Sequence, residues 1–157
     1  MSGVVIRPAE PGDHDGWLDA ALASWLDAYQ FVLPADEVAN APAMLETAWT
    51  KRWQELRVAV LDGAVVGFYS LGDAAKPDEV NYLWHLYVDP KVQRRGVGRA
   101  LHEAALAEIA ARSAATAWLD VIRQNDKARA FYAALGWRVT KTETDSGYDL
   151  VVMERDI

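Results

Sequence analysis

A basic segment that contains two glycines is the part of the sequence best suited to bind an anion. Four of the sixteen basic residues lie within nine positions, in a chain of formal net charge −7: Lys91, Arg94, Arg95 and Arg99. Gly96 and Gly98 lie inside this cluster, directly before an apolar helical pattern. Glycine lets backbone N–H groups converge on one point, and a helix start adds N–H donors and a positive dipole end. The segment therefore predicts a pyrophosphate site.

Two other phosphate-binding loops fit less well. The pattern GxxxxGK[ST] is absent from the sequence, which excludes a Walker-type nucleotidase. The dinucleotide pattern GxGxxG matches only at Gly96 and Gly98, because its third position is Leu101. Asp120 lies at the distance that pattern requires, but the seven residues Asp89–Arg95 are too many for the tight turn between strand and helix. A dinucleotide-dependent enzyme is therefore disfavoured.

The elements that must position this segment form a mixed α/β pattern. Helices are expected from Asp13, from Pro42, from Gly98 to about Arg112, and from Asn125 to Gly136. Strands are expected at residues 4–6, 56–61, 64–71, 80–88, 117–122, 137–142 and 148–155, with a tight hairpin at Asp62-Gly63. The fourth strand, the helix and the fifth strand form a parallel crossover unit. No repeat or linker interrupts residues 1–157, which predicts a single domain.

Two motifs, in the right order, resemble those of the GNAT superfamily of acyl-CoA-dependent N-acetyltransferases. Its pyrophosphate loop, Gln/Arg-x-x-Gly-x-Gly/Ala, is matched by Gln93–Gly98 after the strand end Val88-Asp89-Pro90. A second block, Asn125, Ala128, Phe131-Tyr132 and Leu135-Gly136-Trp137, matches the downstream signature at its usual spacing. The resemblance implies a mixed, mostly antiparallel sheet with helices on both faces and splayed parallel fourth and fifth strands.

The same resemblance implies how acetyl-CoA would be held as co-substrate, without a metal. The backbone of Leu86, Tyr87 and Val88 would pair with the pantetheine arm. The loop would hold the pyrophosphate, largely through main-chain N–H groups; its residues are Gln93, Arg94, Arg95, Gly96, Val97, Gly98 and Arg99. Asn125 and Ala128 would contact the far side of the pantetheine near the thioester.

Catalytic roles also follow from the resemblance. Tyr132 would be the general acid, since a phenol is protonated at pH 7 and close to a thiol in acidity; the alternative is a packing aromatic beside Phe131. Many family members carry a glutamate within the fourth strand, but Asn81–His85 contains no carboxylate. Glu79 and His85 are the remaining candidates for the general base, although a lone histidine in an apolar strand is more often structural. Base catalysis through water, or an acceptor that arrives neutral, is equally open.

The acceptor is expected to be a primary amine of a small molecule or peptide, but the sequence does not identify it. Aromatic residues of the first two helices, and Tyr82 or Trp84, are candidates to line an acceptor cleft, while most of the tryptophans have core spacing. The missing strand carboxylate leaves an alternative from another class, a catalytically weak domain that binds acyl-CoA as a sensor or interaction module.

Composition narrows the remaining classes. The net charge argues against nucleic acid as the main partner, and the absence of cysteine excludes disulfides and thiolate catalysis. The three histidines show no metal-ligand spacing. No signal peptide and no apolar run long enough to span a membrane are visible, which predicts a cytoplasmic protein without a membrane partner. The hairpin of residues 137–155 offers a sheet edge through which two copies could form a homodimer.

Overall fold

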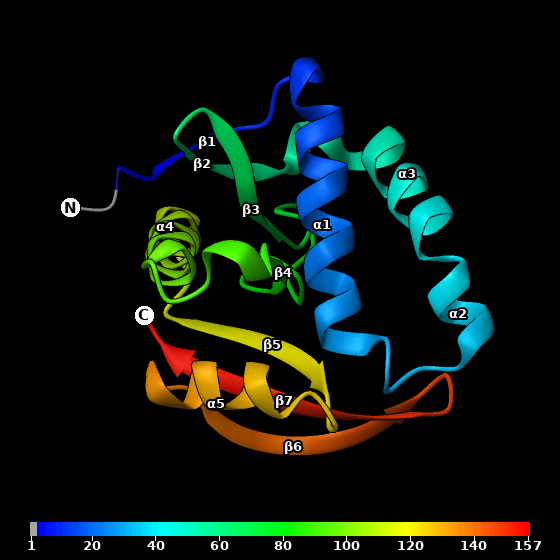
Figure 1. Ribbon diagram of the computed structural model, residues 1–157. Coiled ribbons are helices and arrows are strands. Elements are labelled where there is room, and N and C mark those ends of the chain that lie inside the picture. Colours follow the sequence, from blue (N-terminus) through cyan, green and yellow to red (C-terminus); the bar gives the residue numbers. More distant parts are fainter. Residues whose placement is uncertain (1–2) are drawn as a thin grey trace. The chain divides into compact units, whose positions relative to one another are not determined.

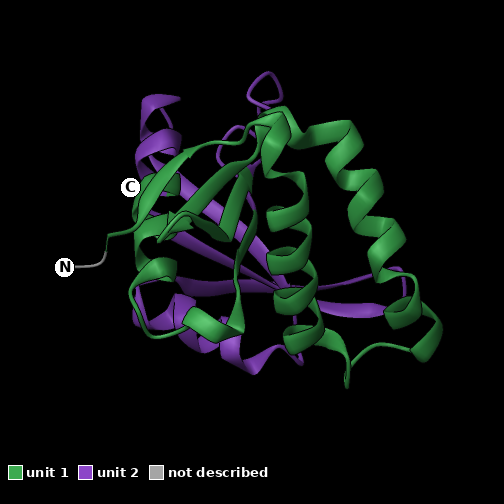
Figure 2. Cartoon of the chain, turned by 45° about the horizontal axis from the view of Figure 1, so that its top comes forward, with its two compact units in different colours: residues 1–70, 85–105 green, residues 71–84, 106–157 purple. Residues whose placement is uncertain are grey.

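The computed structural model describes residues 3–157, and its chain divides into two compact units (Figures 1 and 2). The first unit, green in Figure 2, runs to Ser70 and resumes at His85–Ala105. The second unit, purple in Figure 2, contains Leu71–Trp84 and Leu106–Ile157. A single domain over residues 1–157 stays a prediction.

The first sheet has the strand order β1-β2-β3-β4. Its strands are β1 (Val5–Pro8), β2 (Arg57–Leu61), β3 (Ala64–Leu71) and β4 (Leu83–Val88). The pairs β1–β2 and β2–β3 are antiparallel. At the predicted hairpin Asp62 and Gly63 both have positive φ, 52° and 82°, as a two-residue primed turn requires.

Helices cover one face of this sheet in the first unit (Figure 1). They are α1 (His14–Tyr29), α2 (Ala35–Ala39) and α3 (Ala41–Arg52), of which the five-residue α2 was not predicted. Trp17 of α1 lies 5.3 Å from the ring of Trp49 and 5.4 Å from that of Phe68 on β3. These buried rings join α1, α3 and the sheet into one core, so most tryptophans of this region serve packing, as predicted.

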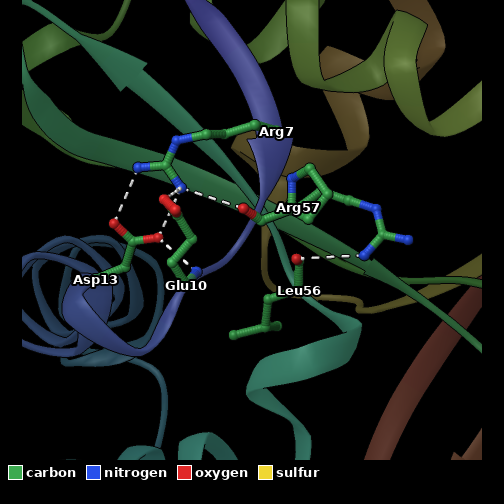
Figure 3. A network of polar contacts seen from close by, with 6 residues as sticks. Arg7, Glu10, Asp13, Leu56 and Arg57 are labelled. Atoms are coloured by element: carbon green, nitrogen blue, oxygen red, sulfur yellow. Dashed lines mark hydrogen bonds and ion pairs between the residues drawn. The ribbon is translucent and has the colours of Figure 1, made fainter.

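Asp13 does not cap α1 as expected. It occupies the N-cap position, but its side chain makes no capping hydrogen bond to α1. Instead, both of its carboxylate oxygens accept hydrogen bonds from the Arg7 guanidinium, at 2.8 and 3.0 Å, and one accepts from the Glu10 N–H (Figure 3). The bidentate pair joins two opposite charges through two hydrogen bonds, and Arg7 holds the pKa of Asp13 below its usual range. Asp13 therefore ties β1 to the start of α1.

The opposite face of the first sheet receives the beginning of α4 (Val97–Ala111). Gly67 on β3 makes this approach possible, because a Cβ there would lie 3.1 Å from Leu101 Cδ1. Leu101 and Val97 are almost completely buried. Helices thus lie on both faces of the sheet in the first unit, as the sequence predicted.

The second unit contains an antiparallel sheet of order β5-β7-β6 and one further helix. Its elements are β5 (Thr116–Ile122), α5 (Asp126–Ala134), β6 (Arg138–Asp145) and β7 (Tyr148–Asp156). Gly136, with φ of 92°, follows α5 as the predicted C′ glycine. The predicted mixed, mostly antiparallel α/β class is confirmed.

The strand β4 begins at Leu83 and is therefore shorter than the expected strand 80–88. Two reverse turns occupy the preceding residues, in which Glu79 N–H donates to Lys76 O and Tyr82 N–H donates to Glu79 O. Tyr82 pairs with β5 through an isolated parallel bridge to Trp118, beside which Trp118 N–H donates to Asn81 O at 3.1 Å. Asn81 Nδ2 and Trp118 Nε1 fix this segment further by donating to Thr116 O and Asp78 O.

Candidate functional site

The predicted pyrophosphate loop follows β4 directly. Asp89 N–H donates to Val66 O at 2.8 Å, which anchors the loop to β3. The Asp89 side chain accepts from Lys91 N–H at 3.0 Å and caps the 3-10 turn Pro90–Val92. A proline at the first position of this turn supplies the φ that it needs. The strand end Val88-Asp89-Pro90 thus sets the direction in which the basic segment leaves the sheet.

Two residues of the loop have left-handed backbone conformations, Arg94 with φ of 69° and Gly96 with φ of 82°. The helix α4 begins one residue later, and Ala100 N–H donates to Gly96 O at 3.0 Å. The first N–H groups of a helix have no intrahelical acceptor, so those of Val97, Gly98 and Arg99 are directed out of the helix start.

The chemistry of this donor set fits an anionic group. A Cβ built on Gly96 would meet no atom within 4 Å, so the space beside the loop is open. Arg94, Arg95 and Arg99 are exposed around it. Backbone donors at a helix start, with three exposed cations beside them, can bind a pyrophosphate without a dedicated side-chain ligand.

The end of β4 is held close to β3 at Gly67. A Cβ on Gly67 would lie 2.7 Å from the carbonyl oxygen of Tyr87 and 3.4 Å from Val88 Cα. Only glycine fits here without a backbone shift, so Gly67 fixes the position of the predicted pantetheine-binding segment, Leu86–Val88. All three of its residues are partly buried. No motif in the sequence indicated this role of Gly67.

His85 lies in an environment that keeps its imidazole neutral. Burial, reinforced by the positive charge of Arg52, lowers the pKa of His85 to about 4. Its Nδ1 is hydrogen-bonded to Ser70 Oγ at 2.7 Å, and either atom can donate according to the tautomer. The rings of Phe68 and Tyr87 lie near it at 6.3 and 6.1 Å. At neutral pH His85 is therefore a weak base bonded to a serine.

Glu79, the other candidate base, lies in the turns before β4 in the second unit. Its carboxylate accepts from Asp73 N–H at 3.2 Å and pairs with Lys76 at 3.6 Å. The backbone around it is tight, because a Cβ on Gly72 would lie 2.4 Å from Glu79 O. Glu79 is thus a partly exposed carboxylate in a well-defined turn.

The downstream motif lies on α5. Asn125 caps this helix, as predicted, by accepting a hydrogen bond from Ala128 N–H at 3.2 Å. Tyr132 is 6% exposed and packs edge-on against Phe131 and Trp137, with ring centroids 5.2 and 5.6 Å away. The motif therefore builds a rigid helix start and a fixed phenol, both within the second unit.

Two side-chain hydrogen bonds had no signal in the sequence. Ser70, the partner of His85, is fifteen residues away and becomes visible only through the pairing of β3 with β4. Tyr82, a candidate to line an acceptor cleft, donates its hydroxyl to Asp120 at 2.7 Å and stacks on Trp118 at 4.1 Å, and its place in a cleft stays a prediction. Burial and the Asp120 carboxylate raise the pKa of Tyr82, so its phenol stays protonated.

Metal-ligand clusters and membrane-spanning helices are both absent from residues 3–157, the part of the chain that the structure describes. In this described part of the chain, no three His, Cys, Asp or Glu side chains gather as metal ligands would. No helix in the same range has the length and apolar character needed to cross a membrane.

Relatives of known sequence were found for parts of the chain. The [ribosomal protein bS18]-alanine N-acetyltransferase of Escherichia coli K12 is 38% identical over 77 residues, which are 45% of this chain and 52% of that protein. The chain thus matches about half the length of this relative. A 5-NmdU N-acetyltransferase of Pseudomonas phage PaMx11 is 29% identical over 136 residues, which cover 87% of this chain and 88% of that protein.

Solved structures agree with the fold over the whole chain. A GCN5-related N-acetyltransferase from Rhodopseudomonas palustris has a TM-score of 0.79 and 25% identity, with 100% of this chain and 98% of that one covered. The PaiA N-acetyltransferase of Thermoplasma acidophilum, solved with coenzyme A, has a TM-score of 0.76 and 22% identity over both complete chains. The second likeness concerns the fold alone.

The model of the acetyltransferase (GNAT) family matches residues 18–137, well over half of the chain. This range includes the loop Gln93–Gly98 and the block from Asn125 to Trp137. The match supports the predicted enzyme class, an acetyl-CoA-dependent N-acetyltransferase. The chain belongs to the acetyltransferase (GNAT) family.

Proposed function

We propose that this protein transfers an acetyl group from acetyl-CoA to a primary amine of a small molecule or peptide. The observation that carries the proposal is the loop before α4. It combines left-handed Arg94 and Gly96, an open side at Gly96 and outward N–H groups of a helix start. Family membership supplies the acyl-CoA chemistry.

In this proposal, the acetyl-CoA contacts come from the three stretches that resemble the family's motifs. The loop from Gln93 to Arg99 holds the pyrophosphate, and the backbone of Leu86–Val88 pairs with the pantetheine arm. The tight contact at Gly67 supports this role, because it fixes the Tyr87 carbonyl. Asn125 and Ala128 are the further residues proposed to contact the pantetheine. The capping bond of Asn125 uses its side-chain oxygen, which leaves the amide N–H₂ as the group available to donate.

Tyr132 is the proposed general acid. Attack of a neutral amine on the thioester carbonyl forms the C–N bond, and the C–S bond breaks as the thiolate leaves. The thiolate takes its proton from the Tyr132 hydroxyl, while the amine nitrogen gives up one proton to a base. The packing of Tyr132 between Phe131 and Trp137 supports this role, because a fixed phenol needs little reorganisation.

The candidates for the general base are Glu79, His85 and water, and each predicts a different result. The usual advantage of histidine, a pKa near 7, is lost here because burial lowers the pKa of His85 to about 4. If His85 is the base, His85→Gln should lower kcat/KM and Glu79→Gln should not. If Glu79 is the base, the opposite holds. If water takes the proton, both variants should keep the pH profile of the wild type.

The acceptor is proposed only as an amine. The names of the Escherichia coli and phage relatives both describe transfer to nitrogen, one on an alanine and one on 5-NmdU. The two acceptors differ in class, so they support an amine acceptor and leave its identity to a screen.

The test of the proposal is steady-state turnover of acetyl-CoA with a panel of amines, for the wild type and for Tyr132→Phe. Removing the hydroxyl should lower kcat by about a hundredfold or more with little change in the dissociation constant of acetyl-CoA. Tyr148→Phe, in the hairpin of the same unit, is the matched control and should keep kcat. Equal kcat for Tyr132→Phe and the wild type would rule Tyr132 out as the acid.

A second candidate function is an acyl-CoA-binding module with weak catalysis. It is favoured by β4, which has no carboxylate, and by the low basicity of His85. Tight acetyl-CoA binding without turnover of any amine in the panel would select this alternative.

A further inference from the structure

The strand β6 is an edge strand with an unusual degree of exposure. It ends the sheet order β5-β7-β6, and all eight of its residues are exposed (Figure 1). Its neighbour β7 buries Val151, Val152 and Met153. A long exposed edge strand offers backbone donors and acceptors to another strand.

The hairpin turn determines which backbone groups of β6 face that edge. Ser146 and Gly147, with φ of 52° and 84°, form a two-residue turn between the paired residues Asp145 and Tyr148. The pair that flanks such a turn exchanges both N–H···O bonds, and these bonds then alternate along the strands. The N–H and C=O of Lys141, Glu143 and Asp145 therefore point to β7. Those of Thr142 and Thr144 point away from β7, to the open edge.

Two opposite charges on β6 flank Thr142, one on each side. Lys141 and Glu143 flank Thr142, share one face of the strand and form an exposed ion pair at 2.8 Å. Antiparallel pairing of β6 with a second β6, centred on Thr142, would place Lys141 of each copy opposite Glu143 of the other. The two Thr142 residues would exchange backbone hydrogen bonds, and the charged pairs would be non-hydrogen-bonded pairs, whose side chains approach more closely.

The other nearby centres are unfavourable. A centre on Lys141 would place two lysines opposite each other, and a centre on Glu143 would do so with two glutamates. A centre on Thr144 would place Glu143 opposite Asp145 of the second copy. Since like charges directly opposite each other destabilise a sheet, only the Thr142 register satisfies both the backbone and the charges.

We propose that two copies of this chain associate through β6, paired antiparallel about a two-fold axis at Thr142. The partner is a second copy because the charge pattern is complementary to itself under that axis. An irregularity between Val139 and Lys141 lies before the pairing segment, so Lys141–Asp145 keeps a regular register with β7. Like charges protect edge strands from self-pairing, whereas mirrored opposite charges favour it.

The experiment is sedimentation velocity on the full chain over a series of concentrations, with Lys141→Glu, Glu143→Lys and their equimolar mixture. Each single variant places like charges in both cross-strand pairs, so its dimer dissociation constant should rise by about tenfold or more over the wild type. In the mixture, one copy carries two positive and the other two negative side chains, so heterodimers should form with nearly wild-type affinity.

The mixture separates the proposed contact from effects within one copy. Both single variants lose their internal ion pair, so only attraction between copies can restore association. Lys127→Glu, at an exposed position of α5, changes the net charge by as much as Lys141→Glu does and should leave the dimer intact. Circular dichroism and melting temperature verify the fold of each variant. A monomeric wild type, unchanged association of the single variants, or a mixture that fails to recover would each overturn the proposal. None of these outcomes depends on acetyl transfer.

Discussion

The loop from Asp89 to Gly98 and the strand around His85 are neighbours in the sequence, but their side chains and backbones contribute differently. The loop carries its chemistry on backbone groups, and its left-handed residues and helix start follow from local sequence. The properties of His85 come instead from Ser70, Arg52 and the burial of its ring.

This difference explains why the loop motif predicts chemistry better than the strand motif does. A glycine and a helix start produce the same donor geometry in any fold that contains them. An isolated histidine can be a base, a core residue or a hydrogen-bond partner, and the choice depends on neighbours distant in sequence. Substitutions in the two regions should therefore have separable effects.

The largest expected effect is on the strand side, in the pH dependence of stability. The unfolded chain binds a proton at His85 near pH 6.5, whereas the folded chain binds it only near pH 4. Above pH 6.5 His85 is neutral in both states and costs no stability. As the pH falls toward 4, the unfolded chain binds a proton that the folded chain does not, so the free energy of unfolding falls by about 3 kcal/mol. Urea unfolding between these pH values should show the fall in the wild type.

His85→Gln should flatten that dependence. His14 is the control, because its pKa is raised by hydrogen bonds to Glu46 and Asp15, so its stabilising contribution is lost on raising the pH instead. His14→Gln should therefore keep the loss of stability at low pH. An equally steep fall in His85→Gln would show that His85 is not the group responsible.

The next largest effect is expected at Gly67, which contacts the end of β4 between His85 and the loop. Gly67→Ala forces a Cβ to within 2.7 Å of the Tyr87 carbonyl, so β4 must shift. We expect the free energy of unfolding to fall by about 1–3 kcal/mol and acetyl-CoA to bind more weakly. Gly16→Ala, whose Cβ would lie 3.5 Å from Val65, should lower neither, because alanine is the better helix former, as measured by urea unfolding and calorimetric titration. Unchanged acetyl-CoA affinity in Gly67→Ala would argue against pantetheine binding at Tyr87.

The smallest expected effect is that of Gly96→Ala, which changes the loop alone. Gly96 and Gly63 have the same φ of 82°, and a Cβ on either would meet no atom within 4 Å. Alanine at either position should cost about 1–2 kcal/mol of backbone strain. Gly96→Ala should in addition weaken acetyl-CoA binding by about tenfold, whereas Gly63→Ala should not. Equal acetyl-CoA affinities for the two variants would separate the loop from ligand binding.

Much of the fold was predictable because its signals are local. Asp62-Gly63, Pro42, Asn125 and Gly136 mark the turns and helix ends where they were expected. The family was predictable for the same reason, since its loop motif and the Asn125–Trp137 block are continuous in sequence.

The misses share a physical cause, which is a partner distant in the chain. Asp13 is bound by Arg7 rather than by the helix it precedes. Tyr82 is bound by Asp120, thirty-eight residues away, and Ser70 is matched to His85 only by strand register. The strand at residues 80–88 was predicted too long because the turns that end at Tyr82 were not recognised.

Thermal unfolding with acetyl-CoA, CoA, NADH and ATP in parallel tests most directly whether the loop from Gln93 to Arg99 binds acyl-CoA. A ligand at 100 times its dissociation constant stabilises the fold by about 2.7 kcal/mol, which shifts the melting temperature measurably. We expect a shift with acetyl-CoA and CoA that is smaller in Gly96→Ala. No shift with either, or a larger shift with NADH, would contradict acyl-CoA binding by the loop from Gln93 to Arg99.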